Sequence, residues 1–384
     1  MKSIRYISLL VVAVLMAGCV RERKPLNFGD FVPSYTPRHA SGFRLLSSPS
    51  MKSRMLHVSN PWQGAENFDQ LALVLAEGET RPDWFEGCLL NAPAERIVVM
   101  SSSYVAMLDA IGCEERIVGV SGLRYVSNEK VQRAAREGRV KDVGYDASTN
   151  FELIRALRAD LVLLYGVSGE QRAMTDKLKA LDIPYLYIGD YAEEEPLGKA
   201  EWLVALSALC GCEERGQRVF AEIEREYLAV QQQAAERSRQ GRRPKVMLNV
   251  PYQDIWYMPS ADSYMVRLIE AAGGEYLYKE NDTGRSLPIS TERAMLLARE
   301  ADVWLNVGQL TSMAELKRAC PKFVKARSVT SGRVYNNNLR QGPSGGSDFW
   351  ESGTVYPHRI LADLMAIFYP SDTDDMFYYY RHLK

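Results

Sequence analysis

Aromatic and arginine side chains recur just after the predicted strands of this chain, where the ligand-binding loops of parallel sheets lie. Aromatic rings can stack on a flat, conjugated molecule, and guanidinium groups pair with carboxylate or catecholate oxygens. The pattern therefore predicts a site for a flat, partly anionic ligand. We expect roughly half of these side chains to line it and the rest to pack loops. The candidates are Arg124, Tyr125, Tyr145, Tyr165, Tyr252, Trp256, Arg285, Arg340 and Trp350.

Histidines are too few and too scattered to predict a site for a bare metal ion. The chain has four, His39, His57, His358 and His382, and none stands in a His-x-His or His-Glu-x-x-His pair. His358 follows Pro357 at a predicted helix start, where a capping or core role is favoured over that of a lone haem ligand. We therefore expect no protein-bound metal and no cofactor, and a ligand that arrives as a preassembled metal complex.

Signs of catalysis are weak. Asp348 and Glu351 stand near His358 and could suggest acid–base work. Gly-x-Ser-x-Gly is matched at Gly342–Gly346, but this stretch belongs to a polar loop and lacks the strand-to-helix turn that a nucleophile motif needs, and the sequence has no phosphate-binding glycine loop. We expect a binding protein rather than an enzyme.

Two glutamates occupy matching places in two similar units. Glu152 lies in Asn150–Gly166 and Glu292 in Ser290–Gly308, and each unit reads as a capped helix, Ala-Asp and an apolar strand. A glutamate in a first helical turn is favoured by the helix dipole, which is the simpler explanation for either one alone. The paired units predict two similar α/β lobes.

One long helix is predicted between these units, over 212–240. Its apolar residues recur at steps of three and four, and Gly241 and Pro244 end it. A helix that bridges two lobes resists hinge bending, so we expect a cleft between the lobes that is largely preformed. The apolar positions are Phe220, Ile223, Tyr227, Val230 and Ala234.

Alternating strands and helices predict α/β lobes with mostly parallel sheets, the N-terminal lobe over 94–211 and the C-terminal lobe over 241–384. Short strand-like runs split by turn residues predict a small antiparallel β appendage over 41–93. Residues 19–40 read as a tether.

The N-terminus reads as a targeting segment. Lys2 and Arg5 precede an apolar stretch, and small residues lead to Cys19, as in a bacterial lipobox. Residues 1–18 would be a lipoprotein signal peptide, Cys19 the acylated residue, and the protein periplasmic and lipid-anchored. An ordinary secretory signal or a membrane anchor is the alternative. The five later cysteines fit no dense disulfide framework, so we expect buried thiols: Cys88, Cys113, Cys210, Cys212 and Cys320.

The charge balance argues against a nucleic-acid partner. Lys and Arg together number 47 and Asp and Glu 48, which leaves a net charge of −1. Beyond the N-terminus, no run of about 18 apolar residues predicts a membrane span.

Several stretches resemble the substrate-binding proteins of bacterial ABC importers for ferric siderophores, haem and vitamin B12, the two-lobed type with a rigid helical linker. The similarity covers about residues 94–370, and the second lobe contributes Ala272-Gly-Gly274 and Ser290-Thr-Glu292. The stretch from Tyr335 to Gly353 looks like a branch with the β appendage, found in lipoproteins of Bacteroidetes-type bacteria. In the first lobe, the similar stretches are Arg96–Ser102, Arg116–Ser121, Val143-Gly144, Asn150–Glu152 and Leu157–Leu163.

This resemblance implies a function and partners. The protein would capture an iron complex, ferric siderophore or haem, as a monomer, and deliver it to an ABC permease with its ATPase. Glu152 and Glu292 would form salt bridges with permease arginines. A cobalamin-binding protein of the same type, a chelatase-like haem-processing enzyme and a surface lipoprotein that only scavenges ligand are the alternatives.

Overall fold

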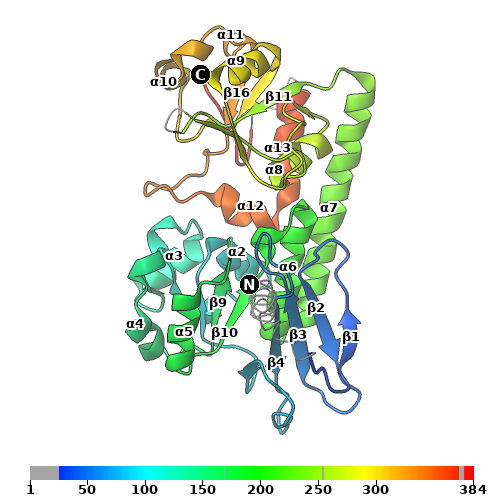
Figure 1. The fold of residues 1–384 in the computed structure, drawn as a ribbon, viewed down its shortest axis with the longest axis vertical. Helices are drawn as coiled ribbons and strands as arrows, with labels where there is room; N and C mark the ends of the chain where they lie inside the picture. The colour runs from blue at the N-terminus through cyan, green and yellow to red at the C-terminus, as the bar shows by residue number, and fades with distance from the viewer. Residues whose placement is uncertain (1–25, 168, 253–254, 372–375) are drawn as a thin grey trace, which may run out of the picture.

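The computed structural model describes residues 26–167, 169–252, 255–371 and 376–384. Two α/β lobes lie one above the other along the long axis, joined by the long helix α7 (Figure 1). The predicted signal peptide and Cys19 lie outside the described residues. Within those residues, no helix has both the length and the apolar character needed to cross a membrane.

The N-lobe is built on a five-stranded parallel sheet in the order β10-β9-β6-β7-β8. Its central strands are short apolar runs that are buried except at Tyr165, as expected where helices cover both faces of a sheet. The strands are β6 (Ile97–Val99), β7 (Ile117–Val120), β8 (Lys141–Asp142), β9 (Leu161–Tyr165) and β10 (Tyr185–Ile188).

Helices of the N-lobe begin at polar caps. Ser101 caps the first of them, and Asn150 caps the helix that carries Glu152. The helices are α2 (Ser102–Ala110), α3 (Glu129–Arg136), α4 (Phe151–Ala156), α5 (Arg172–Ala180) and α6 (Pro196–Leu209), with short 3₁₀ turns η1 (Glu114–Arg116), η2 (Leu123–Tyr125), η3 (Asp146–Ser148) and η4 (Asp190–Ala192).

The C-lobe repeats this plan with a sheet in the order β13-β11-β15-β16-β17, parallel except for its last strand. A separate antiparallel pair, β12-β14, lies beside it. The strands are β11 (Lys245–Leu248), β12 (Trp256–Met258), β13 (Glu275–Tyr276), β14 (Leu287–Ile289), β15 (Val303–Leu305), β16 (Val334–Asn336) and β17 (Arg381–His382). The helices are α8 (Tyr264–Ala271), α9 (Thr291–Glu300), α10 (Met313–Ala319), α11 (Arg327–Thr330), α12 (Ser352–Val355) and α13 (Pro357–Phe368), with 3₁₀ turns η5 (Pro321–Phe323) and η6 (Asp348–Trp350).

The two repeated units play the same part in both lobes. The Asp160 carboxylate accepts hydrogen bonds from the backbone N–H groups of Glu95 and Arg96 at 3.0 and 2.9 Å. The Asp302 carboxylate accepts one from Lys245 N–H at 2.9 Å. Each aspartate thus holds the start of the first strand of its lobe, so α4–β9 and α9–β15 correspond.

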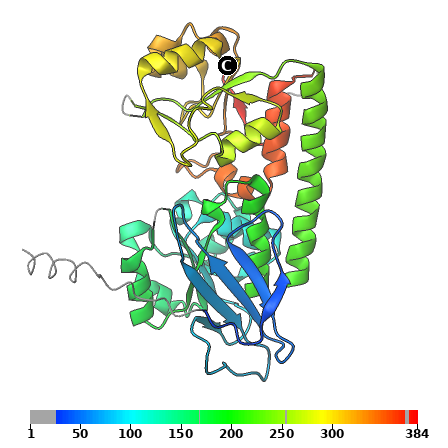
Figure 2. The same ribbon diagram turned by 45° about the vertical axis from the view of Figure 1, so that its right-hand side comes forward.

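Helix α7 (Glu213–Gln240) matches the predicted bridge in place and length, and packs along α6 and α13 (Figures 1 and 2). Phe220, Ile223, Tyr227 and Ala234 are buried and Val230 is half-buried, so the predicted apolar face is the packed one. The two-lobed fold with a rigid helical linker is confirmed.

The N-terminal appendage is a five-stranded sheet in the order β1-β2-β3-β4-β5. Two expectations need correction. The strand β1, which contains Pro33, lies inside the predicted tether and pairs at the sheet edge, and β5 runs parallel to β4 rather than antiparallel. The strands are β1 (Val32–Tyr35), β2 (Phe43–Ser47), β3 (Arg54–Ser59), β4 (Asp69–Val74) and β5 (Cys88–Leu90).

Two buried carboxylates fasten the appendage to the N-lobe. Glu201 on α6 accepts hydrogen bonds from Tyr35 Oη at 2.6 Å and from the N–H groups of residues 38–40 at 2.8 to 2.9 Å. Glu193 accepts from the N–H groups of Ser41 and Gly42 and from Trp202 Nε1. The appendage therefore lies against the N-lobe as one packed unit (Figure 2).

Candidate functional site

A cleft lies between the lobes and consists of two adjoining hollows of about 520 and 400 Å³. Both are lined from the N-lobe by the Ser101–Ser102 cap of α2 and by loops that follow the strands, and from the C-lobe by Trp350 of η6. Gln63 of the appendage also reaches the larger hollow. The site thus forms at the carboxyl ends of the N-lobe strands, as parallel sheets favour.

Aromatic rings form much of the cleft wall. Tyr125 and Tyr145 meet edge to face with ring centroids 5.9 Å apart. Tyr165 at the end of β9 and Tyr191 in η4 line both hollows. On the opposite side of the cleft, the ring centroids of Trp350 and Tyr264 are 6.2 Å apart. Trp350 is 47% exposed, so much of its indole ring is open to a ligand.

The larger hollow has a buried polar floor. Lys199 on α6 donates to the backbone carbonyls of Asp190 at 2.6 Å and Tyr191 at 3.2 Å. Burial lowers the pKa of the Lys199 ammonium and raises that of the Asp190 carboxyl, and their mutual attraction opposes both shifts. Ser263 Oγ is buried with no hydrogen-bond partner among the described residues. Lys199 and Ser263 can therefore donate hydrogen bonds to a ligand oxygen, although the carboxyl groups of Asp190, Glu193 and Glu194 line the same hollow.

Direct contacts between the lobes fix the width of the cleft. The buried Glu351 carboxyl of the C-lobe accepts a hydrogen bond from Ser127 N–H of the N-lobe at 2.7 Å. Arg267 on α8 pairs with Glu195 at 2.7 Å. A Cβ added at Gly346 would lie 2.1 Å from the Tyr125 carbonyl oxygen, so glycine permits the close approach there. These contacts, together with α7, indicate a preformed site.

The structure brings Tyr125, Tyr145, Tyr165 and Trp350 together at the cleft, but it places the two arginines differently from the prediction. Arg124 is exposed beside the cleft, with its guanidinium 4.6 Å from the Tyr125 ring. Arg340 pairs with Asp348 at 2.5 Å and lies over the Tyr378 ring. In the described structure neither arginine lines the two hollows.

The remaining candidates lie away from the cleft wall. Trp256 is buried in the C-lobe core against Trp304, because strand alternation in β12 turns it and Met258 inward. Tyr252 is 68% exposed, outside both hollows. Arg285 is exposed on the loop whose neighbouring residues 284 and 286 line the larger hollow. Trp256 therefore does not serve as a ligand-stacking ring.

Several cleft residues were absent from the prediction. Tyr191 follows β10 and obeys the same strand-end rule, so it could have been found. Lys199 carried a different signal, a lysine that shares a mostly apolar helix with one other charged residue, Glu201. Ser263 and Tyr264 at the start of α8 carried no signal that the sequence alone separates from an ordinary helix start.

The histidines have partners elsewhere. His358 Nε2 lies 2.9 Å from Glu226 of the linker helix, and burial lowers its pKa. His39, His57 and His382 contact Glu224, Asp69 and the Gly332 carbonyl. None of these four, all in the described part of the chain, lines the cleft. Among the described residues, no group of three or more His, Cys, Asp or Glu side chains could hold a metal ion.

The acid–base candidates near His358 have structural partners. Asp348 holds Arg340, and Glu351 holds the other lobe. Burial raises the pKa of Glu351 to about 8. In the described structure neither carboxyl lines the two hollows.

Glu152 and Glu292 are exposed in the first turns of α4 and α9, the corresponding helices of the two lobes. Hydrogen bonds from its own backbone N–H and from Ser290 lower the pKa of Glu292. Within the described residues, neither carboxylate is engaged in an ion pair. Both are available to a partner outside the chain.

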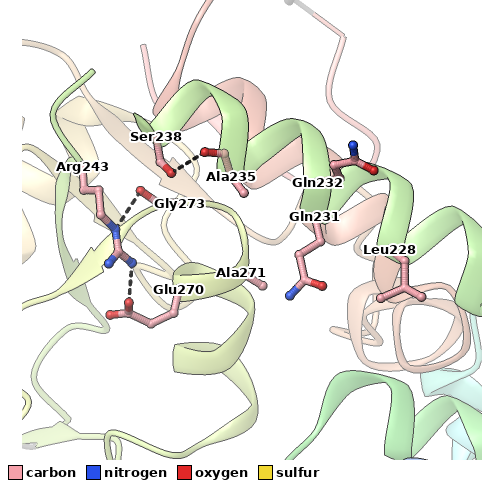
Figure 3. A pocket seen from close by; sticks show the side chains of 9 residues that line it. All are labelled: Leu228, Gln231, Gln232, Ala235, Ser238, Arg243, Glu270, Ala271 and Gly273. Carbon is pink, nitrogen blue, oxygen red and sulfur yellow. Dashed lines mark hydrogen bonds and ion pairs between the residues drawn. The ribbon is translucent and has the colours of Figure 1, made fainter. Parts of the chain in front are cut away.

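A further hollow of about 600 Å³ lies between α7 and α8 (Figure 3). Arg243 and Glu270 pair with each other at its edge, and Gln231, Gln232 and Leu228 of α7 face it. It has no aromatic lining and lies apart from the inter-lobe cleft, so the cleft is the better candidate.

The chain matches a known protein family over most of its two lobes. The model of the family described as periplasmic binding protein matches residues 97–336, which span both lobes and the linker helix. The matched stretch begins at the first strand of the N-lobe and ends in β16 of the C-lobe.

Two relatives from one archaeon resemble this chain in sequence. An uncharacterized lipoprotein of Methanocaldococcus jannaschii, MJ0878, is 24% identical over 393 residues, which cover 94% of this chain and 91% of that protein. A second uncharacterized protein of that organism, MJ0642, is 22% identical and covers 61% of this chain and 68% of its own length.

Solved structures share the fold at low sequence identity. A periplasmic haem-binding protein of Pseudomonas aeruginosa matches with a TM-score of 0.56 and 20% identity, over 72% of this chain and 94% of its own. The vitamin B12-binding protein BtuF of Vibrio cholerae matches with a TM-score of 0.52 and 16% identity, over 73% of this chain and 99% of its own. The periplasmic haem-binding protein RhuT of Roseiflexus in its apo form matches with a TM-score of 0.55 and 20% identity, over 72% of this chain and 98% of its own.

Proposed function

This chain belongs to the periplasmic binding protein family, and from that premise we propose that it is the solute-binding component of an ABC importer for a preassembled iron complex, a ferric siderophore or haem. The observation that carries the proposal is the inter-lobe cleft, with Tyr125, Tyr145, Tyr165, Tyr191 and Trp350 along its walls.

The shape and chemistry of the cleft support a bulky, partly flat ligand. The two hollows adjoin, so one ligand can occupy both, and each lies within the size range of small-molecule sites. The exposed face of Trp350 and the edge-to-face tyrosine pair offer stacking surfaces for a conjugated ring or an aromatic chelating arm.

The anionic part of the ligand would meet the floor. Lys199 and Ser263 can donate to a carboxylate or catecholate oxygen there. This differs from the sequence-based hypothesis, in which Arg124 and Arg340 would pair with the anionic oxygens of the ligand. The solved haem- and vitamin B12-binding proteins of the same fold are consistent with such ligands.

The protein would work at the outer face of a membrane beside its permease and ATPase. Corresponding exposed glutamates on the two lobes, Glu152 and Glu292, would pair with arginines of the permease. Acylation of Cys19 would hold the protein at the membrane, in keeping with the lipoprotein name of the relative MJ0878.

The absorbance spectrum and native mass spectrum of protein purified from its own host would identify the ligand. A Soret band with a mass increase of one haem would support the haem form of the proposal. A visible charge-transfer band with the mass of a ferric chelate would support the siderophore form. The spectrum and mass of a cobalamin would favour the alternative ligand of the same type, and a loss of metal from bound porphyrin during incubation would indicate a chelatase.

A further inference from the structure

Three of the five cysteines that follow residue 25 meet at one place in the N-lobe. Cys113 Sγ lies 3.6 Å from Cys212 Sγ, although the two residues are 99 positions apart in the chain. Cys210 also contacts the Cys113 thiol. Cys113 follows α2, Cys210 ends α6 and Cys212 begins α7, so the cluster lies where the linker helix leaves the N-lobe.

The backbone around this cluster is held firmly. Cys113 N–H donates to the Leu108 carbonyl and Cys212 N–H to the Ser207 carbonyl, both at 2.8 Å. Gly211, with a φ of +67°, turns the chain between Cys210 and Cys212. The meeting of Cys113 and Cys212 is therefore a property of the packed fold rather than of mobile side chains.

We propose that Cys113 and Cys212 are a redox site that is oxidised to a disulfide after export. A disulfide needs the two sulfurs to approach from 3.6 Å to about 2 Å. Periplasmic binding proteins work outside the cytoplasm, where disulfides form and persist. The three thiols do not form a metal site, since no such group was found among the described residues.

The oxidant is a disulfide-bearing molecule, either an exported dithiol oxidase or glutathione disulfide. Cys212 is half-buried and lines a surface hollow of about 1130 Å³, so an oxidant can reach its sulfur. The Cys212 thiol loses its proton and attacks the oxidant disulfide, which forms a mixed disulfide and frees one oxidant thiol. The Cys113 sulfur then attacks Cys212 Sγ and expels the second oxidant thiol. Two cysteine thiols thus lose two electrons and two protons, and one oxidant disulfide becomes two thiols.

Accessibility sets this order of attack, because Cys113 is buried and Cys212 is only half-buried. Hydrogen bonds from Cys210 and Cys212 lower the pKa of Cys113, and the hydrogen bond with Cys113 raises the pKa of Cys212, so Cys212 gives up its proton only as it attacks the oxidant. The Cys113 sulfur lies beside Cys212 Sγ, where it can resolve a mixed disulfide on that neighbour. Cys210 is buried, so the oxidant reaches the cluster through Cys212.

Peptide mapping of the full chain tests the assignment. The protein is exported into an oxidising compartment, purified without reductant and incubated with glutathione disulfide, and free thiols are alkylated during unfolding. We expect a linked peptide pair containing Cys113 and Cys212, two hydrogen atoms lighter than its reduced form. Cys88, Cys210 and Cys320 should carry the alkyl group.

Variants separate the pair from its neighbours. Cys113→Ser and Cys212→Ser should each abolish the link. Cys210→Ser and the matched control Cys320→Ser, a buried thiol of the C-lobe, should keep it. Reduction should lower the melting temperature of the wild type by roughly 5 °C and leave Cys212→Ser unchanged, because a long loop is no longer closed in the unfolded chain.

Peptide mapping of the wild-type protein alone can decide whether Cys113 and Cys212 form a disulfide. Full alkylation of both Cys113 and Cys212 after the glutathione disulfide incubation would overturn the proposal. A wild-type link from Cys113 to Cys210 would overturn the assigned pair. Neither result depends on which ligand the cleft binds.

Discussion

At the cleft floor, the side chains suited to meet a ligand are those whose hydrogen bonding is incomplete. Lys199 gives two of its three N–H donors to backbone carbonyls, and the Ser263 hydroxyl has no partner among the described residues. A buried polar group without a partner costs free energy in the empty protein. An anionic ligand oxygen that accepts hydrogen bonds from these donors would remove that cost. The free energy lost in the empty protein would then contribute to the affinity for the ligand.

Replacing Lys199 tests this link. Lys199→Gln should weaken binding of an anionic complex such as haem about tenfold, because a charged hydrogen bond is lost. Isothermal calorimetry measures the change, and Lys177→Gln, an exposed lysine on α5, is the matched control. Equal affinity in Lys199→Gln and wild type would remove Lys199 from the site.

Glu351 predicts a dependence of stability on pH. Burial raises its pKa to about 8, so the folded protein keeps a proton that the unfolded chain loses near its ordinary value of 4.5. The contribution of this group to stability is complete below that ordinary value and is lost as the pH rises through about 8.

The Glu351→Gln variant lacks this titration. Between pH 5 and pH 9 the melting temperature of the wild type should fall relative to that of Glu351→Gln, whose amide oxygen can still accept from Ser127 N–H. Burial raises the pKa of Asp363 to about 6. Because Asp363 titrates in both proteins, its effect cancels from the difference between their melting temperatures. Parallel melting curves for the two proteins across this range would contradict the account.

At the scale of elements, the sequence predicted those helices and strands whose formation depends on nearby residues alone. The 3.6-residue period of α7, its glycine stop and the buried apolar strands of both lobes could all be predicted from the sequence. The strand β1 could not, because Val32–Tyr35 contains a proline and is held by pairing with β2. The strand-end rule predicted Tyr125, Tyr145 and Tyr165 at the cleft, but not Ser263, whose place depends on how the lobes pack.

The appendage depends on one buried carboxylate of α6. Glu201→Ala should lower the free energy of unfolding by about 3 kcal/mol, because it leaves the Tyr35 hydroxyl and three backbone N–H groups without their acceptor. Urea unfolding measures the loss, and proteolysis should begin near residues 32–42. Glu224→Gln, which changes the partly exposed contact with Arg38, is the control and should cost less than about 1 kcal/mol. A stability loss in Glu201→Ala no larger than in the control would contradict this role.

At the scale of the whole molecule, the correspondence of Asp160 and Asp302 places Glu152 and Glu292 at matching points of the two lobes. A permease with matching halves could bind such a pair. The double change of Glu152 and Glu292 to Ala should abolish uptake of the iron complex and leave ligand affinity intact. Asp176→Ala, an exposed acidic residue on α5, should leave uptake unchanged. Loss of affinity in the double variant would place these residues in the cleft or in folding instead.

Ligand binding at the aromatic cleft tests the central claim most directly. Calorimetry with a ferric siderophore, haem and cobalamin should show tight binding of one of the three to the wild type. Tyr165→Ala and Trp350→Ala should each weaken it about tenfold to a hundredfold, because each removes a stacking ring. Tyr252→Ala, an exposed ring outside the cleft, should bind like the wild type. Tight binding of free Zn²⁺ or Mn²⁺ with none of the three complexes bound, or full affinity in both cleft variants, would contradict the account.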